Sequence, residues 1–147
     1  MIFTTLTKKA LLLAYEAHKD QLDRTGLPYI FHPYRIAEEM IDESSTCVAL
    51  LHDLIEDTDT TLEDLESEGF PAEVVEGVRL MTHEEDVPYF DYVERLKTNP
   101  LARAVKLADL RDNSNVDRLE KVEEEDLKRF EKYREATRIL SEVDDQN

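Results

Sequence analysis

The stretch Cys47-Val-Ala-Leu-Leu-His52-Asp53-Leu-Ile-Glu56-Asp57-Thr-Asp-Thr60 places four ionisable side chains within six positions of an otherwise apolar run. Apolar residues recur in it at the spacing of one helix face, which predicts a helix whose buried side carries Val48, Leu51 and Ile55. A run this apolar belongs in the core of a helical domain. The ionisable residues therefore enter the core with it.

On that helix the four ionisable side chains share one flank. His52 and Glu56 are four residues apart, and so are Asp53 and Asp57, which makes each pair neighbours on the helix surface. Carboxylates this close repel one another, and partial burial makes each charge more costly. The cluster therefore needs raised pKa values or a cation, and a divalent metal ion would supply that cation.

A structural interpretation of the same residues is also open. A histidine at the edge of an apolar helix is often a satisfied core residue, and acidic residues at a helix end are often only solvated. Carboxylates at a helix C-terminus, however, oppose the helix macrodipole. Helix formation alone does not explain their position, so the rest of the chain has to supply matching ligands.

Length and composition indicate one domain spanning residues 1–147. The sequence has no run of 18 apolar residues, and its N-terminus lacks the order of a secretory signal, so we expect a cytoplasmic protein with no membrane partner. The single Cys47 fits a reducing compartment and is expected to be a small core residue. No sequence feature fixes the oligomeric state.

The charge balance argues against long nucleic acids as partners. Eighteen Lys and Arg face thirty-five Asp and Glu, for a net charge of −17, which disfavours binding to a polynucleotide backbone. A small phosphorylated ligand remains possible where a few cations and a metal converge. We expect the densest acidic runs to be solvated surface, namely 84–86, 123–126 and 144–145.

Helical periods and helix-starting residues account for most of the chain, which predicts an all-α fold. The predicted helices are 6–21, one opened by Pro33 with His32 at its mouth, 47–57, one from a Thr61–Asp64 capping box to Gly69, one from Pro71, one from Pro88, 100–113 and 124–143, before a frayed end at 144–147. His32 could then be no more than a helix cap. In the segment after Pro88 we expect Phe90, Val93 and Leu96 to face the core, with Tyr92 on another face.

The helix at 100–113 carries a second unusual carboxylate. Asp109 adjoins a face of small apolar residues, where solvation alone would not place a charge. Lys106 and Asn113 lie beside it at helical spacing. A buried salt bridge from Asp109 to Lys106 or Arg111 is the structural alternative to a functional role.

Three segments together resemble a known family. His32, the His52-Asp53 doublet and Asp109 occur in the order found in HD-domain metal-dependent phosphohydrolases. The segments Tyr29-Ile-x-His32-Pro33, Ala49-Leu-Leu-His52-Asp53-x-x-Glu56-Asp57-Thr58 and Val105-Lys106-Leu107-Ala108-Asp109-x-x-x-Asn113 resemble the hydrolase domain of the RelA/SpoT-type alarmone enzymes. The resemblance covers about residues 17–113 and implies a compact multi-helix HD-domain bundle.

The resemblance also implies a metal centre and a reaction. It assigns the metal, commonly Mn²⁺, to His32, His52, Asp53 and Asp109. Two imidazoles and two carboxylates suit Mn²⁺, Fe²⁺ or Zn²⁺ and leave positions open for water and a phosphate oxygen. The implied reaction removes pyrophosphate from the 3′ position of guanosine tetra- or pentaphosphate.

The remaining roles concern water and substrate. Glu56 and Asp57 match the pair that orients and activates water, and either could accept its proton. Asn113 matches a residue of the nucleotide pocket, and we assign Arg24 and Lys106 to substrate binding as well. All five residues lie in the segments that carry the resemblance or in the loop before His32.

Two departures leave the substrate open. The family usually has adjacent Arg-Lys in the loop before the first metal histidine, whereas this chain has Asp23-Arg24, and the arginine of the last motif is displaced to Arg111. A pocket with fewer cations suits a less charged nucleotide. The alternatives are therefore a nucleotidase or nucleoside-triphosphate hydrolase of other specificity, or a nucleotide-binding regulatory module with little turnover.

Overall fold

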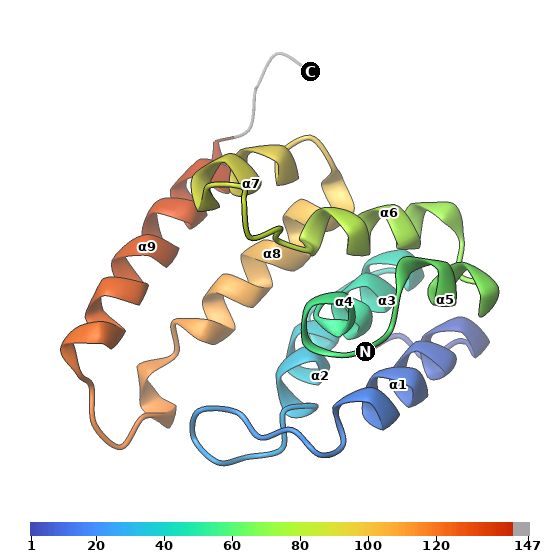
Figure 1. The fold of residues 1–147 in the computed structure, drawn as a ribbon, viewed down its shortest axis with the longest axis horizontal. Coiled ribbons are helices and arrows are strands. Elements are labelled where there is room, and N and C mark those ends of the chain that lie inside the picture. The colour runs from blue at the N-terminus through green and yellow to red at the C-terminus, as the bar shows by residue number, and fades with distance from the viewer. Residues whose placement is uncertain (143–147) are drawn as a thin grey trace.

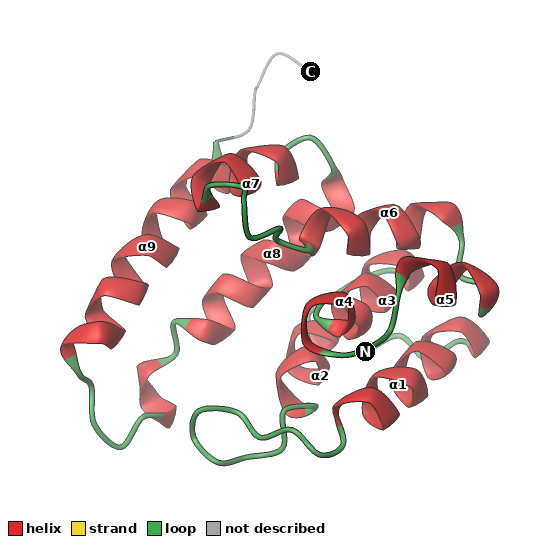
Figure 2. Cartoon of the chain, in the orientation of Figure 1, coloured by secondary structure: helices red, strands yellow, loops and turns green. Residues whose placement is uncertain are grey.

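The computed structural model describes residues 1–142, and within that range the chain forms helices and no strand (Figure 2). The α-helices are α1 Thr5–His18, α2 Phe31–Glu38, α3 Glu43–Leu51, α4 Leu54–Asp57, α5 Leu62–Ser67, α6 Ala72–Met81, α7 Tyr89–Leu96, α8 Pro100–Asn113 and α9 Glu124–Ser141. This confirms the all-α prediction. The predicted frayed end at 144–147 lies outside the described residues.

Helix α3 is the centre of the bundle. It packs against α1, α2, α6 and α8, while α9 packs against α7 and α8. In Figure 1, α8 and α9 run beside each other on one side of the molecule, α1 lies on the opposite side, and α2 packs against both α3 and α8. The loop after α1 and the connection between α8 and α9 reach the same lower edge of this view.

The sequence of α3 explains its position. Residues 47–51 are all fully buried, because a helix that is apolar on every side is stable only when other elements surround it. Helix α6 comes especially close. A Cβ on Gly77 would lie 2.8 Å from Val48 Cγ2, so a residue without a side chain is needed at this crossing.

The prediction of one helix over 47–57 is wrong at its middle, because α3 ends at Leu51 and α4 begins at Leu54. His52 Nδ1 donates to the Ala49 carbonyl at 2.6 Å. In an unbroken α-helix that carbonyl would accept from the amide four residues later, so the His52 side chain competes with a helix bond. The break places the His52-Asp53 doublet at a turn.

Other helix ends and faces also differ from the predictions. Helix α2 begins at Phe31 rather than Pro33, and Pro33 is tolerated there because first-turn amides have no intrahelical partner. On α7, Phe90 is 41% exposed whereas Tyr92 is 5% exposed. Tyr92 is drawn inward because its hydroxyl donates to the Met81 carbonyl at 2.5 Å.

Capping boxes start two of the helices. Thr61 and Asp64 form the predicted box of α5, and Thr4 and Thr7 form another at the start of α1. Gly69 follows α5 with a φ of +91°, the left-handed conformation that glycine adopts without strain. Along residues 1–142, no helix has the length and apolar character needed to cross a bilayer.

Candidate metal centre

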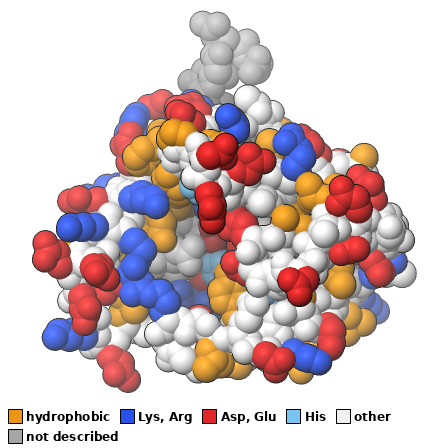
Figure 3. Space-filling model, in the orientation of Figure 1, with side chains coloured by type: hydrophobic (Ala, Val, Ile, Leu, Met, Phe, Trp, Pro, Cys, Tyr) orange, Lys and Arg blue, Asp and Glu red, His pale blue; other side chains and the backbone are white. Residues whose placement is uncertain are grey.

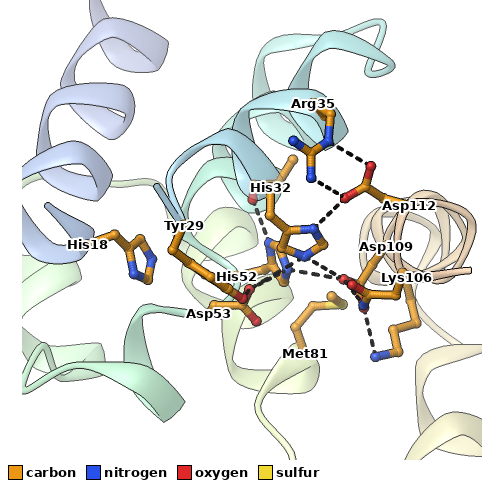
Figure 4. Close-up of polar contacts among 12 residues, drawn as sticks. His18, Tyr29, His32, Arg35, His52, Asp53, Met81, Lys106, Asp109 and Asp112 are labelled. Atoms are coloured by element: carbon orange, nitrogen blue, oxygen red, sulfur yellow. Dashed lines mark hydrogen bonds and ion pairs between the residues drawn. The ribbon is translucent and has the colours of Figure 1, made fainter. Parts of the chain in front are cut away.

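Three elements bring the predicted ligands together at the centre of the molecule (Figure 4). His32 comes from α2, the His52-Asp53 doublet from the turn between α3 and α4, and Asp109 from α8. His32 Nε2 lies 2.9 Å from Asp109 Oδ1 and 3.7 Å from Asp53 Oδ2. His52 Nε2 lies 3.0 Å from Asp53 Oδ2 and 3.6 Å from Asp109 Oδ1.

Both imidazoles are held so that Nε2 faces this cluster. His52 Nδ1 contacts the Ala49 carbonyl, which can only accept, so this nitrogen carries the proton. His32 Nδ1 lies 2.7 Å from Asp112 Oδ2, another acceptor. Anchoring the Nδ1–H group to an acceptor is how proteins orient a metal-binding histidine. His32 is therefore no helix cap.

The cluster fits a divalent cation. Ligand atoms of His32, His52 and Asp109 lie within 4.8 Å of one another, and all three residues are buried. His52 Nε2 is buried and finds no hydrogen-bond partner among residues 1–142, although Asp53 is close. A buried imidazole nitrogen without such a partner, beside two carboxylates, suits a borderline metal ion.

Asp53 lies beside His52 and has a further partner outside these three ligands. Its Oδ2 accepts a hydrogen bond from the Tyr29 hydroxyl at 2.5 Å. Burial raises the Asp53 pKa, but the attraction and hydrogen bond of His52 together with the attraction of His32 lower it to about 2. Asp53 is therefore an ionised oxygen donor at the edge of the cluster, and its role as a fourth ligand stays a prediction.

The surrounding pKa values show that the cluster attracts positive charge. Burial lowers the His32 pKa, but hydrogen bonds to Asp109 and Asp112 raise it to about 8. Burial would also raise the Asp109 pKa, yet Lys106 and the two imidazoles hold it well below its ordinary value. A divalent ion would take over the charge balance that protons on the imidazoles otherwise supply.

Lys106 forms the buried salt bridge to Asp109 that the sequence analysis gave as the structural alternative. Its Nζ donates to Asp109 Oδ2 at 3.0 Å, and both side chains are largely buried. Arg111 instead pairs with Glu39 on the surface at 3.6 Å. Asp109 thus belongs to a salt bridge and to the imidazole cluster at once, through different oxygens.

The predicted water-activating residues follow the turn on α4. The Glu56 carboxylate accepts from the His83 amide, and its pKa is raised by burial, a shift that this amide opposes. The pKa of Asp57 is raised by burial and then by Asp53. A carboxylate whose pKa moves towards neutrality becomes a better general base. Their catalytic roles stay predictions.

Two of the three predicted substrate residues border a cavity beside His32. Arg24 and Asn113 are among its lining residues, whereas Lys106 is not. Three further arginines line it, Arg35, Arg118 and Arg129. Figure 3 shows blue side chains along a hollow with histidine at its depth. The cavity concentrates cations in an acidic protein, which favours an anionic ligand.

The sequence interpretation missed the residues that support His32. Asp112 accepts from His32 and also from Arg35 Nε at 2.8 Å and Arg118 Nη1 at 2.9 Å. The one sequence signal for Asp112 is its position three residues after Asp109, on a neighbouring part of the same helix surface. Arg35 is 77 residues away in the chain, and Arg118 lies six residues on, after α8 has ended, so helical spacing could not reveal either partner.

The prediction for the acidic run at 123–126 is wrong at Asp126. The run at 123–126 was predicted to be solvated, and residues 123–125 are exposed. Asp126 is 3% exposed. It is buried because its carboxylate accepts from the Glu123 amide at 2.9 Å and from both Arg24 and Arg129.

Known proteins share both the sequence pattern and the fold. The family described as HD domain matches residues 10–140. A guanosine-3′,5′-bis(diphosphate) 3′-pyrophosphohydrolase of Aquifex aeolicus is 35% identical over 72% of this chain and 17% of the relative. The bifunctional (p)ppGpp synthase/hydrolase SpoT of Escherichia coli K12 is 43% identical over 48% of this chain and 11% of its own length.

Shorter proteins also match. The pyrophosphohydrolase MESH1 of Danio rerio is 39% identical over 58% of this chain and 51% of its own length. The chain thus spans between about a tenth and a half of these three relatives. A solved structure described as a metazoan ortholog of SpoT that hydrolyzes ppGpp superposes with a TM-score of 0.80 at 23% identity, covering 99% of this chain and 90% of that one. This likeness shows a shared fold.

Proposed function

The chain belongs to the HD-domain family, and from this membership we propose that it is a metal-dependent hydrolase that removes the 3′-pyrophosphate of guanosine tetra- or pentaphosphate. The observation that carries the proposal is the convergence of His32, His52 and Asp109 from three helical elements around one point. The names of the curated relatives support the choice of substrate.

We assign the metal to His32, His52 and Asp109, with Asp53 as the fourth ligand. Manganese is the first choice, and Fe²⁺ or Zn²⁺ also accepts imidazole and carboxylate ligands. A bound divalent ion would supply an acidified water and charge neutralisation at the phosphoryl oxygens. Tyr29 would keep the Asp53 carboxylate oriented through its hydroxyl.

Protein side chains would carry the proton and hold the substrate. Glu56 lies on the helix directly after the ligand turn and is fixed by the His83 amide, so it is the first choice to accept a proton from the attacking water, with Asp57 as its partner. Lys106 stays charged beside Asp109. Burial lowers the lysine pKa, but the attraction and hydrogen bond of Asp109 together with the nearby Tyr92 and Tyr89 raise it well above its ordinary value.

Arg24 and Asn113 are the proposed nucleotide contacts. Both line the cavity beside His32, and Asn113 Nδ2 also donates to Asp109 Oδ1 at 3.1 Å. That bond would link the occupied pocket to the metal ligand. The arginines of the cavity would bind phosphate oxygens through charge-assisted hydrogen bonds.

A hydrolase acting on a less charged nucleotide is the second candidate. The observation that favours it is the pairing of the cavity cations with carboxylates of the chain, Arg35 and Arg118 with Asp112 and Arg24 with Asp126. Each pairing leaves less positive charge for phosphate groups.

The test is a substrate panel with metal-reconstituted protein. Guanosine tetraphosphate and common nucleoside mono-, di- and triphosphates are incubated with the Mn²⁺, Fe²⁺ and Zn²⁺ forms, and released pyrophosphate and phosphate are measured. The proposal expects pyrophosphate from guanosine tetraphosphate and none after His52→Ala. Phosphate from another nucleotide would favour the second candidate. Binding without turnover for every metal would refute both and leave a regulatory module.

A further inference from the structure

Two carboxylates divide the four arginines of the cavity between them. Asp112 accepts from Arg35 and Arg118, and Asp126 accepts from Arg24 and Arg129. In exposure only Arg24 stands out, because Arg129 is 31% exposed and Arg35 and Arg118 are 32% and 26% exposed. Asp112 also holds His32, so the Asp112 group is tied into the metal centre.

The Asp126 group lies at the outer end of the cavity. Arg24 is 61% exposed and comes from the loop after α1, whereas Asp126 and Arg129 are on the first turns of α9. The Arg24 Nη2 to Asp126 Oδ1 distance is 3.0 Å. This ion pair therefore joins two segments that are 102 residues apart in the chain.

Asp126 occupies the place that an anionic ligand would otherwise take with these two arginines. Its carboxylate is ionised, because the Glu123 amide and then Arg24 and Arg129 hold its pKa below the ordinary value. Arg24 and Arg129 both line the cavity, so a phosphate group that recruits them has to displace this carboxylate. Arg24 is 61% exposed and can turn towards a ligand while staying in solvent. Asp126 is buried, but it keeps the Glu123 amide as a hydrogen-bond donor when Arg24 leaves.

We propose that Asp126 sets the affinity of the cavity for phosphate groups by competing for Arg24 and Arg129. The inference rests on the proposed function, in which the cavity receives a phosphorylated nucleotide. Asp126 thereby lowers the affinity of the cavity for every phosphate-bearing ligand. The loss is smaller for ligands that carry enough phosphate charge to displace the Asp126 carboxylate from both arginines, so the cavity selects for these ligands. It is a specificity-determining residue that does not itself touch the reacting atoms.

Asp126 also has a structural task that the experiment must separate. It completes a capping box with Glu123 at the start of α9, and the loss of such a cap destabilises a helix. Asp64 provides a matched control, because it completes the capping box of α5 by accepting from the Thr61 amide at 2.9 Å and forms no ion pair with any residue from 1 to 142. Asp64→Asn therefore removes the same charge from the same capping position.

The test measures binding of inorganic pyrophosphate to metal-free protein by calorimetry. We expect Asp126→Asn to bind pyrophosphate about fivefold more tightly than the unmodified chain, as the release of one or two ion pairs implies. Asp64→Asn should bind within twofold of the unmodified chain. Adding Arg24→Ala should abolish the gain of Asp126→Asn. Equal or weaker binding by folded Asp126→Asn would overturn the proposal.

A second measurement uses the unmodified chain, so it holds even where Asp126→Asn does not fold. The Asp126 carboxyl is titrated by carbon NMR with and without saturating pyrophosphate. The proposal expects its pKa to rise towards the ordinary aspartate value when the arginines leave, and an unchanged pKa would overturn it. Neither measurement requires turnover, so a protein that leaves guanosine tetraphosphate intact would refute the proposed function without deciding this inference.

Discussion

Replacement of Asp112 by asparagine tests whether the Asp112 carboxylate holds His32 in the orientation that metal binding needs. The Asp112 carboxylate accepts from His32 Nδ1 at 2.7 Å, from Arg35 at 2.8 and 2.9 Å, and from Arg118 at 2.9 Å. An asparagine keeps one acceptor oxygen and turns an NH₂ group towards the other donors. The imidazole of His32 therefore loses its fixed orientation or competes with two arginines for one oxygen.

The expected cost follows from these contacts. Loss of a partner that orients a metal-bound histidine weakens metal affinity by about 10- to 100-fold. The free energy of unfolding should fall by about 2 kcal/mol, since charge-assisted bonds are lost but both arginines can turn to solvent. Asp117→Asn is the matched control, because it removes the same charge from an exposed side chain five residues away.

Calorimetric titration of Mn²⁺ into the two variants and the unmodified chain measures the effect, with circular dichroism to confirm folding. Asp117→Asn should bind like the unmodified chain. A folded Asp112→Asn protein with unchanged Mn²⁺ affinity would refute the reasoning, because His32 would then need no anchor.

Three further changes test other parts of the account. Glu56→Gln should lower kcat by about 10²- to 10⁴-fold, because a general base is lost. Metal analysis should find the ion still bound, and loss of the metal would contradict the role of Glu56 as a base. Arg24→Ala should raise KM more than it lowers kcat in steady-state assays, and an unchanged KM would remove Arg24 from the pocket. Gly77→Ala should lower the free energy of unfolding by about 1–2 kcal/mol in denaturant titrations, because overpacking against Val48 at 2.8 Å outweighs the better helix propensity of alanine. An equally or more stable protein would contradict the close helix crossing.

The sequence predicted the elements whose signals are local. Prolines, capping boxes and apolar spacing placed most helices, and the Thr61–Asp64 box and Gly69 define α5 as expected. The candidate ligands could be picked out because His32, the His52-Asp53 doublet and Asp109 each stand in a recognisable segment. Their convergence to within 4.8 Å for His32, His52 and Asp109 could only come from the fold.

The errors share a physical cause, since each depends on a contact with a distant or backbone partner. The helix break at His52 arises from a bond to the Ala49 carbonyl that competes with the helix. The inward position of Tyr92 depends on the Met81 carbonyl. The burial of Asp126 depends on Arg24, 102 residues earlier in the chain. The spacing of apolar residues carries no information about any of these three partners.

The most direct test of the central claim is a Mn²⁺ titration of chelator-stripped protein, followed by electron paramagnetic resonance. The account predicts one saturable Mn²⁺ ion per chain, which is lost in His52→Ala and in Asp109→Ala. His83→Ala is the control and should retain the ion, because the His83 imidazole contacts the Val87 carbonyl and not the cluster. It also predicts that pyrophosphate release from guanosine tetraphosphate follows the bound ion. Mn²⁺ binding that survives in His52→Ala, or hydrolysis that continues without any divalent ion, would contradict the account.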